Sequence, residues 1–387
     1  MKWDVAPDVI GAWVAEMDLG TAPSVTAALE RAVRDHAFGY APRAWSEALR
    51  SSTARFQHES HGWQVQADEV SVLPGVLSAL RAVITHHTPE GSAVIVPTPA
   101  YMPFLTIPGE LGREHVEVPA LRGGADGTRW ALDLERIEAA MAAGAGLLVL
   151  CHPWNPVGRV LAPEELDAVA ALSSRYGVSV FADEIHAPLV LDPALSHVPY
   201  ASRPATDPDL TFTATAASKA WSIPGLKCAQ LITSGGARRR WEACAVSRHL
   251  AEDAAGIGML ATVAAYDEGR EWLDAVCRYI HATAGEVTQV LTEAGVGVTR
   301  PQATYLSWLD MSGTAAVLLC RGFLRKGFPF VYPSAVSSGR FLRERARVAL
   351  SDGTDFGRGF ESFVRLNLAA PRHLALEAAS RIAGALG

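Results

Sequence analysis

The chain has 387 residues, of which 49% are hydrophobic and 19% are charged, and its formal net charge is −7. This is the composition of a globular protein, and it excludes an intrinsically disordered chain. The negative balance argues against nucleic acid as a main partner, because such a partner requires clustered positive charge.

No localisation signal is recognisable in the sequence. No apolar run approaches the ~20 residues that a membrane-spanning helix needs, and the N-terminal MKWDVAPD lacks the apolar segment of a signal peptide. Scattered cysteines without a CxxC pair are typical of reduced thiols, and not of disulfides or a zinc site. We therefore expect a cytoplasmic protein without a membrane partner or a bound metal. The five cysteines are Cys151, Cys228, Cys244, Cys277 and Cys320.

Short apolar runs and helical stretches alternate along most of the chain. Because these runs are apolar at consecutive positions, they are typical of strands buried on both faces of a mainly parallel sheet. Helical patterns separate them; one follows Pro163, has acidic residues in its first turn and ends at Gly177. This alternation predicts an α/β architecture. The predicted strands are residues 70–73, 93–97, 147–151, 178–182, 210–215 and 229–233.

The pattern changes near residue 273, where longer helical stretches begin and strands become few, for example at residues 305–311. We therefore expect a second, smaller α+β domain. The predicted organisation is an N-terminal segment (1–38) that packs with the small domain, a large ligand-binding domain (39–272) and a small C-terminal domain (273–387).

The most informative stretch is ATAASKAWSIPGLK, in which Lys219 follows a predicted buried strand. Burial penalises the charged form of a lysine, which lowers its pKa and makes the neutral, nucleophilic amine more available. A lysine that forms a Schiff base needs this property. For this segment alone, an exposed lysine at the start of a helix is an equally good interpretation.

Two polar residues follow other predicted strands: Asp183 in ADEIHAPLV and Asn155 in CHPWNPVGRV. In open α/β sheets, ligands bind outside the carboxyl ends of the strands, where Asp183 would lie. A buried carboxylate needs a positive partner, and a protonated ring nitrogen of a bound heterocycle would be one. Prolines on both sides of Asn155 would fix its amide, and these X-Pro bonds can be cis. Taken alone, a helix-capping aspartate and a proline-rich turn are the simpler interpretations.

Two further stretches indicate anion binding. In SVLPGVLSAL, Gly75 permits close approach of the backbone, and the following helix N-terminus offers free N–H groups to a phosphate. In FVRLNLAAPR, Arg365 lies within a short apolar strand, where its guanidinium needs a planar anion such as a substrate carboxylate. An ordinary strand–helix connection and a structural ion pair are the respective alternatives.

Together these stretches resemble the fold-type-I pyridoxal-phosphate (PLP) enzymes of the class I/II aminotransferase superfamily. More narrowly, the chain resembles the PatB/MalY branch of cystathionine β-lyases, or C–S lyases. His186 supports this branch, because aminotransferases usually have a tyrosine there. The residues in the family's order are Tyr101, Asn155, Asp183, Ser218, Lys219 and Arg365. The matching stretches are WVAEMDLGTAP (13–23), FGY (38–40), VPTPAYMPF (96–104), HPWNPVGRV (152–160), ADEIHAPLV (182–190), SKAWSIPGLK (218–227), ATYLSWLDM (303–311) and GRGFESFVRLNLAAPR (357–372).

The resemblance implies PLP-dependent transferase fold type I and a role for each matching residue. Lys219 would carry PLP as a Schiff base and then shuttle protons, and Asp183 would bind the pyridinium nitrogen. Asn155 would bind the 3′-oxygen, Tyr101 would stack on the ring, and His186 would contribute to cofactor binding.

The resemblance also implies how the phosphate and the substrate are held. Arg365 would clamp the α-carboxylate of a small amino-acid substrate. Because one phosphate ligand comes from a second subunit, a homodimer with a shared active site is implied. The implied phosphate ligands are Gly75, Val76, Ser218, Lys227 and Tyr40 of the partner subunit.

The implied reaction is α,β-elimination from an L-cysteine conjugate, giving pyruvate, ammonia and a thiol. An aminotransferase shares the steps up to the carbanion and stays open, as does a specialised biosynthetic PLP lyase or cyclase that acts on an unusual amino acid. A regulatory protein on this scaffold is a further hypothesis. Against it as the sole role stands the presence of five key residues, which are Lys219, Asp183, Asn155, Tyr101 and Arg365.

Several departures from the family pattern leave the substrate open. Ala216 replaces a phosphate-binding hydroxyl, Lys227 replaces the usual phosphate-binding arginine, and Val157 replaces a threonine. Residues 337–355 look like an insertion before the strand of Arg365. The arginines of this stretch would either meet an anionic substrate or belong to a solvated surface helix.

Overall fold

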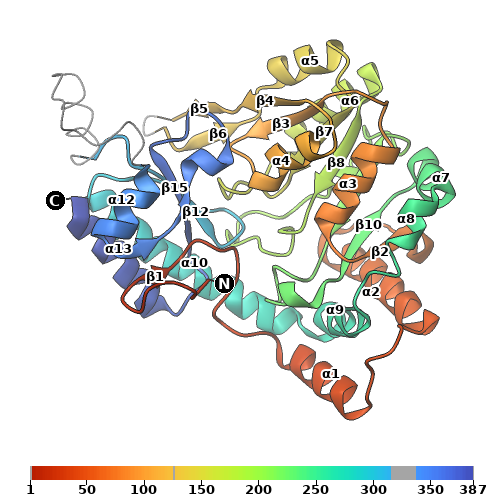
Figure 1. Cartoon of the computed structure of the whole chain (residues 1–387), viewed down its shortest axis with the longest axis horizontal. Coiled ribbons are helices and arrows are strands. Elements are labelled where there is room, and N and C mark those ends of the chain that lie inside the picture. The colour runs from red at the N-terminus through yellow and green to blue at the C-terminus, as the bar shows by residue number, and fades with distance from the viewer. Residues whose placement is uncertain (1, 125–126, 315–336, 387) are drawn as a thin grey trace.

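The computed structural model describes residues 2–124, 127–314 and 337–386 (Figure 1). Its main sheet is mixed: β9, β8, β7, β3 and β4 run parallel to one another, whereas β10 is antiparallel to both of its neighbours. The prediction of a mainly parallel sheet is therefore confirmed. In spatial order its strands are β2 (Val70–Leu73), β10 (Ala229–Ile232), β9 (Thr211–Thr215), β8 (Ser179–Asp183), β7 (Leu147–Cys151), β3 (Val94–Thr98) and β4 (His115–Pro119).

Helices cover both faces of this sheet because alternate strand residues point to opposite sides. Leu148 and Leu150 of β7 belong to the apolar cluster that includes α5 and α6, whereas Leu147 and Val149 belong to the cluster that includes α3 and α4. The strands are thus apolar at consecutive positions because both faces are buried. The helices of this region are α2 (Arg43–His61), α3 (Val76–His86), α4 (Met102–Glu110), α5 (Leu134–Ala142), α6 (Pro163–Tyr176), α7 (Gly235–Ala243), α8 (Ala245–His249) and α9 (Gly256–Glu268).

The sequence signals at α6 act as expected. Pro163 starts the helix, the carboxylate of Glu165 accepts a hydrogen bond from the Ala162 backbone N–H at 2.9 Å, and Gly177 ends the helix with φ +66°. A short hairpin and several single turns complete this part of the chain. They are β5 (Leu121–Gly123), β6 (Arg129–Ala131), and the 3-10 turns η1 (Ala67–Glu69), η2 (Tyr200–Ser202) and η3 (Pro224–Leu226).

A second, antiparallel sheet lies in the C-terminal part, in the order β11-β12-β15-β14. The helices α10 and α13 pack against it through a shared apolar cluster. Helix α10 starts at Arg270, so the predicted domain boundary at residue 273 falls inside a continuous helix. The division into two domains stays a prediction. The elements are α10 (Arg270–Glu293), β11 (Gly297–Thr299), β12 (Leu306–Asp310), α12 (Ser338–Arg345), β13 (Val348–Ala349), β14 (Ser351–Asp352), η4 (Gly353–Phe356), β15 (Phe363–Asn367) and α13 (Arg372–Leu386).

The N-terminal segment contacts two different regions. Strand β1 (Ile10–Gly11) pairs in parallel with β13 of the C-terminal part. Helix α1 (Pro23–Arg34) instead lies at the edge of the molecule, beside α9 (Figure 1), and Ser24 Oγ donates to Ala264 O at 3.1 Å. The expected packing of residues 1–38 with the small domain therefore stays a prediction: β1 lies there, whereas the apolar face of α1 is buried against α9.

Residues 337–355, which the sequence interpretation took for an insertion, are part of the C-terminal fold. After α12, the strands β13 and β14 pair with β1 and β15. Arg340 and Arg343 of α12 are exposed, while Leu342 is buried, so this is the solvated surface helix of the two alternatives. The preceding residues, including Cys320, lie outside the described part.

Among the described residues, no helix combines the length and the apolar character needed to cross a bilayer. The four cysteines in the described ranges, Cys151, Cys228, Cys244 and Cys277, are free thiols. Both findings agree with the sequence-based expectations without testing the predicted location.

Candidate active site

A cavity of about 520 Å³ lies at the carboxyl edge of the main sheet, between that sheet, the N-terminal segment and the strands β14 and β15. Ligand pockets commonly have this size. The cavity brings together ten of the eleven predicted site residues; the exception is Tyr40, which is fully exposed on the surface before α2. The ten are Gly75, Val76, Tyr101, Asn155, Asp183, His186, Ser218, Lys219, Lys227 and Arg365.

Lys219 follows β9 and points into the cavity from the turn after the strand. Its Nζ donates a hydrogen bond to the backbone carbonyl of Ala15 at 2.7 Å. Burial lowers the pKa of Lys219 to about 8, the nearby Arg365 adds to this shift, and Asp183 opposes it. The lysine side chain is thus half-buried and lines the cavity, and it is not an exposed residue at a helix start.

Asp183 is the last residue of β8, paired in register with Cys151 of β7. Its Oδ1 accepts a hydrogen bond from the Ile185 backbone N–H at 3.1 Å. Burial raises the pKa of this carboxyl to about 7, and Lys219 acts in the opposite direction. A cation that joins this carboxyl would lower its pKa again and favour the ionised form at neutral pH.

Asn155 and Arg365 hold each other. Arg365 lies in β15, is 3% exposed, and donates from Nη1 to Asn155 Oδ1 at 3.0 Å. Its Nη2 donates to the Trp13 carbonyl at 2.9 Å and to Ser351 Oγ at 3.1 Å. Its Nε is buried and has no hydrogen-bond partner among the described residues. A buried donor without a partner is costly, so this guanidinium has capacity left for an anion.

The loop that carries Asn155 contains two cis peptide bonds, His152-Pro153 and Asn155-Pro156, as the sequence allows. Because Asn155 Oδ1 already accepts from Arg365, its amide nitrogen is the group left to donate to a ligand.

Gly75 and Val76 form the entrance to α3. Gly75 caps the helix with φ −179°, a backbone conformation that any residue adopts. A side chain at this position would meet no protein atom within 4 Å, so the space beside the backbone is open to a ligand. The helix N-terminus supplies N–H groups and a partial positive charge there. Lys227, with φ +45°, and Ser218 line the same cavity, while Ala216 offers no hydroxyl.

Two ring side chains, those of Tyr101 and His186, line the cavity. Tyr101 caps α4, and its ring lies edge-on to Phe104 at 5.5 Å between centroids. His186 is buried, and its Nδ1 has no partner among the described residues. Burial, with the nearby charges of Lys219 and Arg365, lowers the pKa of His186 to about 3, so its imidazole is neutral at pH 7.

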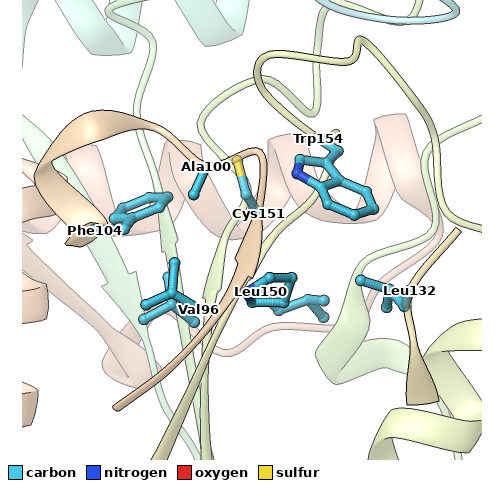
Figure 2. A pocket seen from close by; sticks show the side chains of 9 residues that line it. Val96, Ala100, Phe104, Leu132, Leu150, Cys151 and Trp154 are labelled. Carbon is cyan, nitrogen blue, oxygen red and sulfur yellow. The ribbon is translucent and has the colours of Figure 1, made fainter. Parts of the chain in front are cut away.

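Among the lining residues to which the sequence interpretation gave no role are Trp13, Ala15, Cys151 and Ser351. Trp13 and Ala15 lie in a stretch that carries the family resemblance, but no role was assigned to them. Cys151 also lines a small apolar cavity between β3 and β7, where its thiol lies near Ala100 and Trp154 (Figure 2). Burial raises the pKa of Cys151 well above its ordinary value.

The fold and the cavity define the class of protein. A family model described as aminotransferase class I and II matches residues 8–382, and the chain belongs to this family. It is 35% identical over 388 residues to the cystathionine β-lyase of Corynebacterium glutamicum, an alignment that covers 100% of this chain and 96% of the relative. It is 30% identical over 378 residues to the cystathionine β-lyase PatB of Bacillus subtilis, covering 95% and 91% respectively.

A solved structure gives the same result. A Corynebacterium diphtheriae protein, assigned as a PLP-dependent β-cystathionase, is 35% identical and superposes with a TM-score of 0.86, covering 100% of this chain and 95% of that one. The predicted resemblance to the superfamily and to the PatB/MalY branch is therefore confirmed. The predicted fold type is confirmed with it.

Proposed function

We propose that the chain is a PLP-dependent C–S lyase that splits L-cysteine conjugates by α,β-elimination into pyruvate, ammonia and a thiol. The observation that carries this proposal is that Lys219 and Asp183 line one cavity at the carboxyl edge of the sheet. The lyases of Corynebacterium and Bacillus to which the chain is similar support the reaction class. PLP is the cofactor, and a small amino acid is the substrate.

The side chains of the cavity fit PLP. Asp183 is a buried carboxyl. A protonated ring nitrogen beside it would stabilise its carboxylate form and balance the negative charge. The α3 N-terminus at Gly75 and Val76 suits a phosphate, with Ser218 and Lys227 beside it. The Asn155 amide is free to donate to the 3′-oxygen, and Tyr101 presents an aromatic face; His186 completes the wall.

When bound, PLP supplies an electron-poor ring that accepts the charge left after a proton leaves Cα of the substrate. Asp183 keeps the ring nitrogen protonated, and Lys219 provides the amine that takes the Cα proton. Arg365 holds the substrate carboxylate through the donor capacity that the protein leaves unused. This fixed clamp also sets the direction of the Cα–H bond relative to the ring.

An assay for pyruvate tests this reaction against the aminotransferase alternative, which the family also contains. Purified protein with PLP and an S-substituted cysteine should release pyruvate over many turnovers without a 2-oxo-acid acceptor. If instead the cofactor converts to its pyridoxamine form without pyruvate, and a 2-oxo acid restores it, the enzyme is an aminotransferase.

Replacing Arg365 by lysine keeps the charge but removes the planar fork that matches a carboxylate. We expect kcat/KM for the amino-acid substrate to fall by about 30- to 1000-fold, mainly through KM, since a charge-assisted bidentate contact is lost. Steady-state kinetics measure this. Arg358→Lys, at a side chain that is 92% exposed, is the matched control and should leave kcat/KM unchanged.

We also propose a homodimer in which Tyr40 of the partner subunit binds the phosphate. Tyr40 is fully exposed in the single chain and borders a surface groove formed by α1, α2 and α9. An exposed tyrosine beside an apolar groove is typical of an interface.

We also retain two further proposals: the division into two domains at residue 273 and a cytoplasmic location.

Mixed dimers test the shared site. At limiting PLP, where the loss of a phosphate contact lowers activity, Tyr40→Ala and Lys219→Ala proteins that are unfolded and refolded together should be more active than the mean of the two proteins refolded alone, because half of the dimers then have one intact site. Each variant refolded alone is the control. If mixing restores no activity although mixed dimers form, Tyr40 and Lys219 do not serve the same site from different subunits.

A further inference from the structure

The backbone of residues 13–17, here called the N-terminal strap, crosses the cavity and is held by side chains from distant parts of the chain. Trp13 O accepts from Arg365 and Ser351, and Met17 O accepts from Ser222. Asn367 Nδ2 donates to Val14 O at 2.6 Å and Glu16 O at 2.7 Å. The strap carbonyls are therefore fixed in direction.

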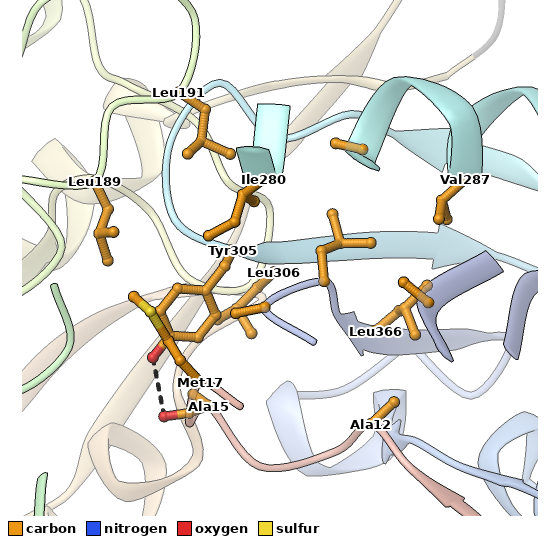
Figure 3. Close-up of a cluster of buried hydrophobic side chains, with 14 of the residues drawn as sticks. Ala12, Ala15, Met17, Leu189, Leu191, Ile280, Val287, Tyr305, Leu306 and Leu366 are labelled. Carbon is orange, nitrogen blue, oxygen red and sulfur yellow. Dashed lines mark hydrogen bonds between the residues drawn. The ribbon is translucent and has the colours of Figure 1, made fainter. Parts of the chain in front are cut away.

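The Ala15 carbonyl at the centre of the strap accepts two hydrogen bonds. One comes from Lys219 Nζ at 2.7 Å, and the other comes from the hydroxyl of Tyr305 at 3.1 Å (Figure 3). Tyr305 is 1% exposed, and its ring belongs to the apolar cluster around Met17 and Leu189. Its hydroxyl is thus a buried polar group that is directed at the same oxygen as the amine.

The backbone on either side of Tyr305 holds it firmly. Thr304 has φ +68°, a left-handed conformation that is rare and strained for a β-branched residue. The Thr304 N–H donates to Leu189 O at 2.8 Å, and the Leu368 N–H donates to Tyr305 O at 2.8 Å. Strained residues persist where the surroundings over-determine them, and here the result is a fixed position for the Tyr305 hydroxyl.

We propose that Tyr305 is a positioning residue which, by holding the Ala15 carbonyl, sets the place where the Lys219 amine rests when it is not bonded to the cofactor. The inference rests on the proposed function, in which that free amine carries the Cα proton. Once the Cα proton has been removed, elimination expels the thiolate from Cβ, whereas transamination delivers a proton to the cofactor carbon. An amine held at the Ala15 oxygen is limited in where it can deliver its proton. An amine without this restraint also reaches the cofactor carbon, which favours transamination.

The first test measures the amine itself, in the full chain without PLP. A reagent that acylates neutral amines is applied across a pH series, and the modified fraction of Lys219 is read from the mass of its peptide. Without the Tyr305 hydroxyl, the Ala15 carbonyl is free to turn away from Lys219 Nζ. An ammonium that loses its carbonyl acceptor is less stable, so the neutral amine is favoured. In Tyr305→Phe we expect acylation at pH 7 to be about 3- to 10-fold faster, with the midpoint at lower pH.

The substitution keeps the ring in the apolar cluster and removes only the hydroxyl. The charged neighbours of Lys219, which are Arg365, Asp183, Glu16 and Lys227, are unchanged. Tyr279→Phe is the matched control, because it also removes a hydroxyl that makes a hydrogen bond, to the Arg372 N–H at 2.6 Å, away from the cavity. An unchanged or raised midpoint in Tyr305→Phe, with folding intact by circular dichroism, overturns the proposal.

The second test uses the holoenzyme. We expect Tyr305→Phe to lower kcat by about 5- to 20-fold with little change in KM, and to lower the number of pyruvate molecules formed per cofactor converted to the pyridoxamine form. Equal kcat and equal partition in Tyr305→Phe and wild type overturn the positioning role. If wild-type protein forms no pyruvate while the acylation midpoint still shifts, the proposed lyase function fails and the positioning of Lys219 stands.

Discussion

Lys219→Ala should lower kcat for α,β-elimination by at least about 10³-fold, because it removes both the covalent anchor of the cofactor and the base that takes the Cα proton. Pyruvate release from an S-substituted cysteine, at saturating PLP, measures this loss. The position of Lys219 in the cavity wall, its hydrogen bond to Ala15 and its lowered pKa all concern the same amine.

Lys227→Ala is the matched comparison, since this lysine lines the same cavity beside the α3 N-terminus. It should weaken PLP binding yet keep kcat within about tenfold once the cofactor is in excess, because a single phosphate contact affects mainly affinity. Comparable kcat losses in the two variants at saturating PLP would contradict the distinct role of Lys219.

Asp183→Asn should abolish most of the activity and, in the cofactor-free protein, raise stability at alkaline pH. The pKa of the Asp183 carboxyl is raised from 3.8 to about 7 in the folded chain, mainly by burial. The folded state therefore keeps this proton up to a higher pH than the unfolded state does. Stability contributed by such a group falls as pH rises from about 4 to 7.

Asparagine cannot ionise, and its side-chain oxygen can still accept from the Ile185 N–H. The stability gain of Asp183→Asn over wild type should thus grow by about 2–3 kcal/mol between pH 5 and pH 8, at 1.36 kcal/mol per pKa unit. Urea unfolding of the cofactor-free proteins at both pH values measures it. The kcat should fall by about 10²-fold or more, since the ring nitrogen loses its ionic partner.

Asp192→Asn is the control, because Asp192 also accepts a backbone hydrogen bond, from Ala194 at 3.0 Å, but lies outside the cavity. It should change neither the pH dependence nor the activity. If Asp183→Asn behaves like Asp192→Asn in both measurements, Asp183 is only a structural cap at the end of β8.

The residues at strand ends were predictable from sequence because the signal is local. Lys219, Asp183 and Asn155 each follow an apolar run, and the carboxyl ends of neighbouring strands meet at one edge of a sheet. The strand bounds were likewise predictable to within a residue, as at β2 and β7, since burial on both faces makes these strands uniformly apolar.

Long-range contacts were not predictable. The Ala15 carbonyl meets Lys219 across 204 positions and Tyr305 across 290 positions, and no local pattern signals a backbone oxygen as a binding group. Ser351 has no local signal of its own in the sequence; its pairing with Arg365 across β14 and β15 brings it to the cavity. The contacts of Tyr40 depend on a second chain, which one sequence cannot position.

The most direct test of the account is to reduce the purified protein with borohydride in the presence of PLP and to map the modified peptide by mass spectrometry. The account predicts a stable cofactor adduct on Lys219, with none on Lys2, Lys227 or Lys326, the other lysines of the sequence. An adduct on another lysine, or a protein that takes up no PLP, would contradict it.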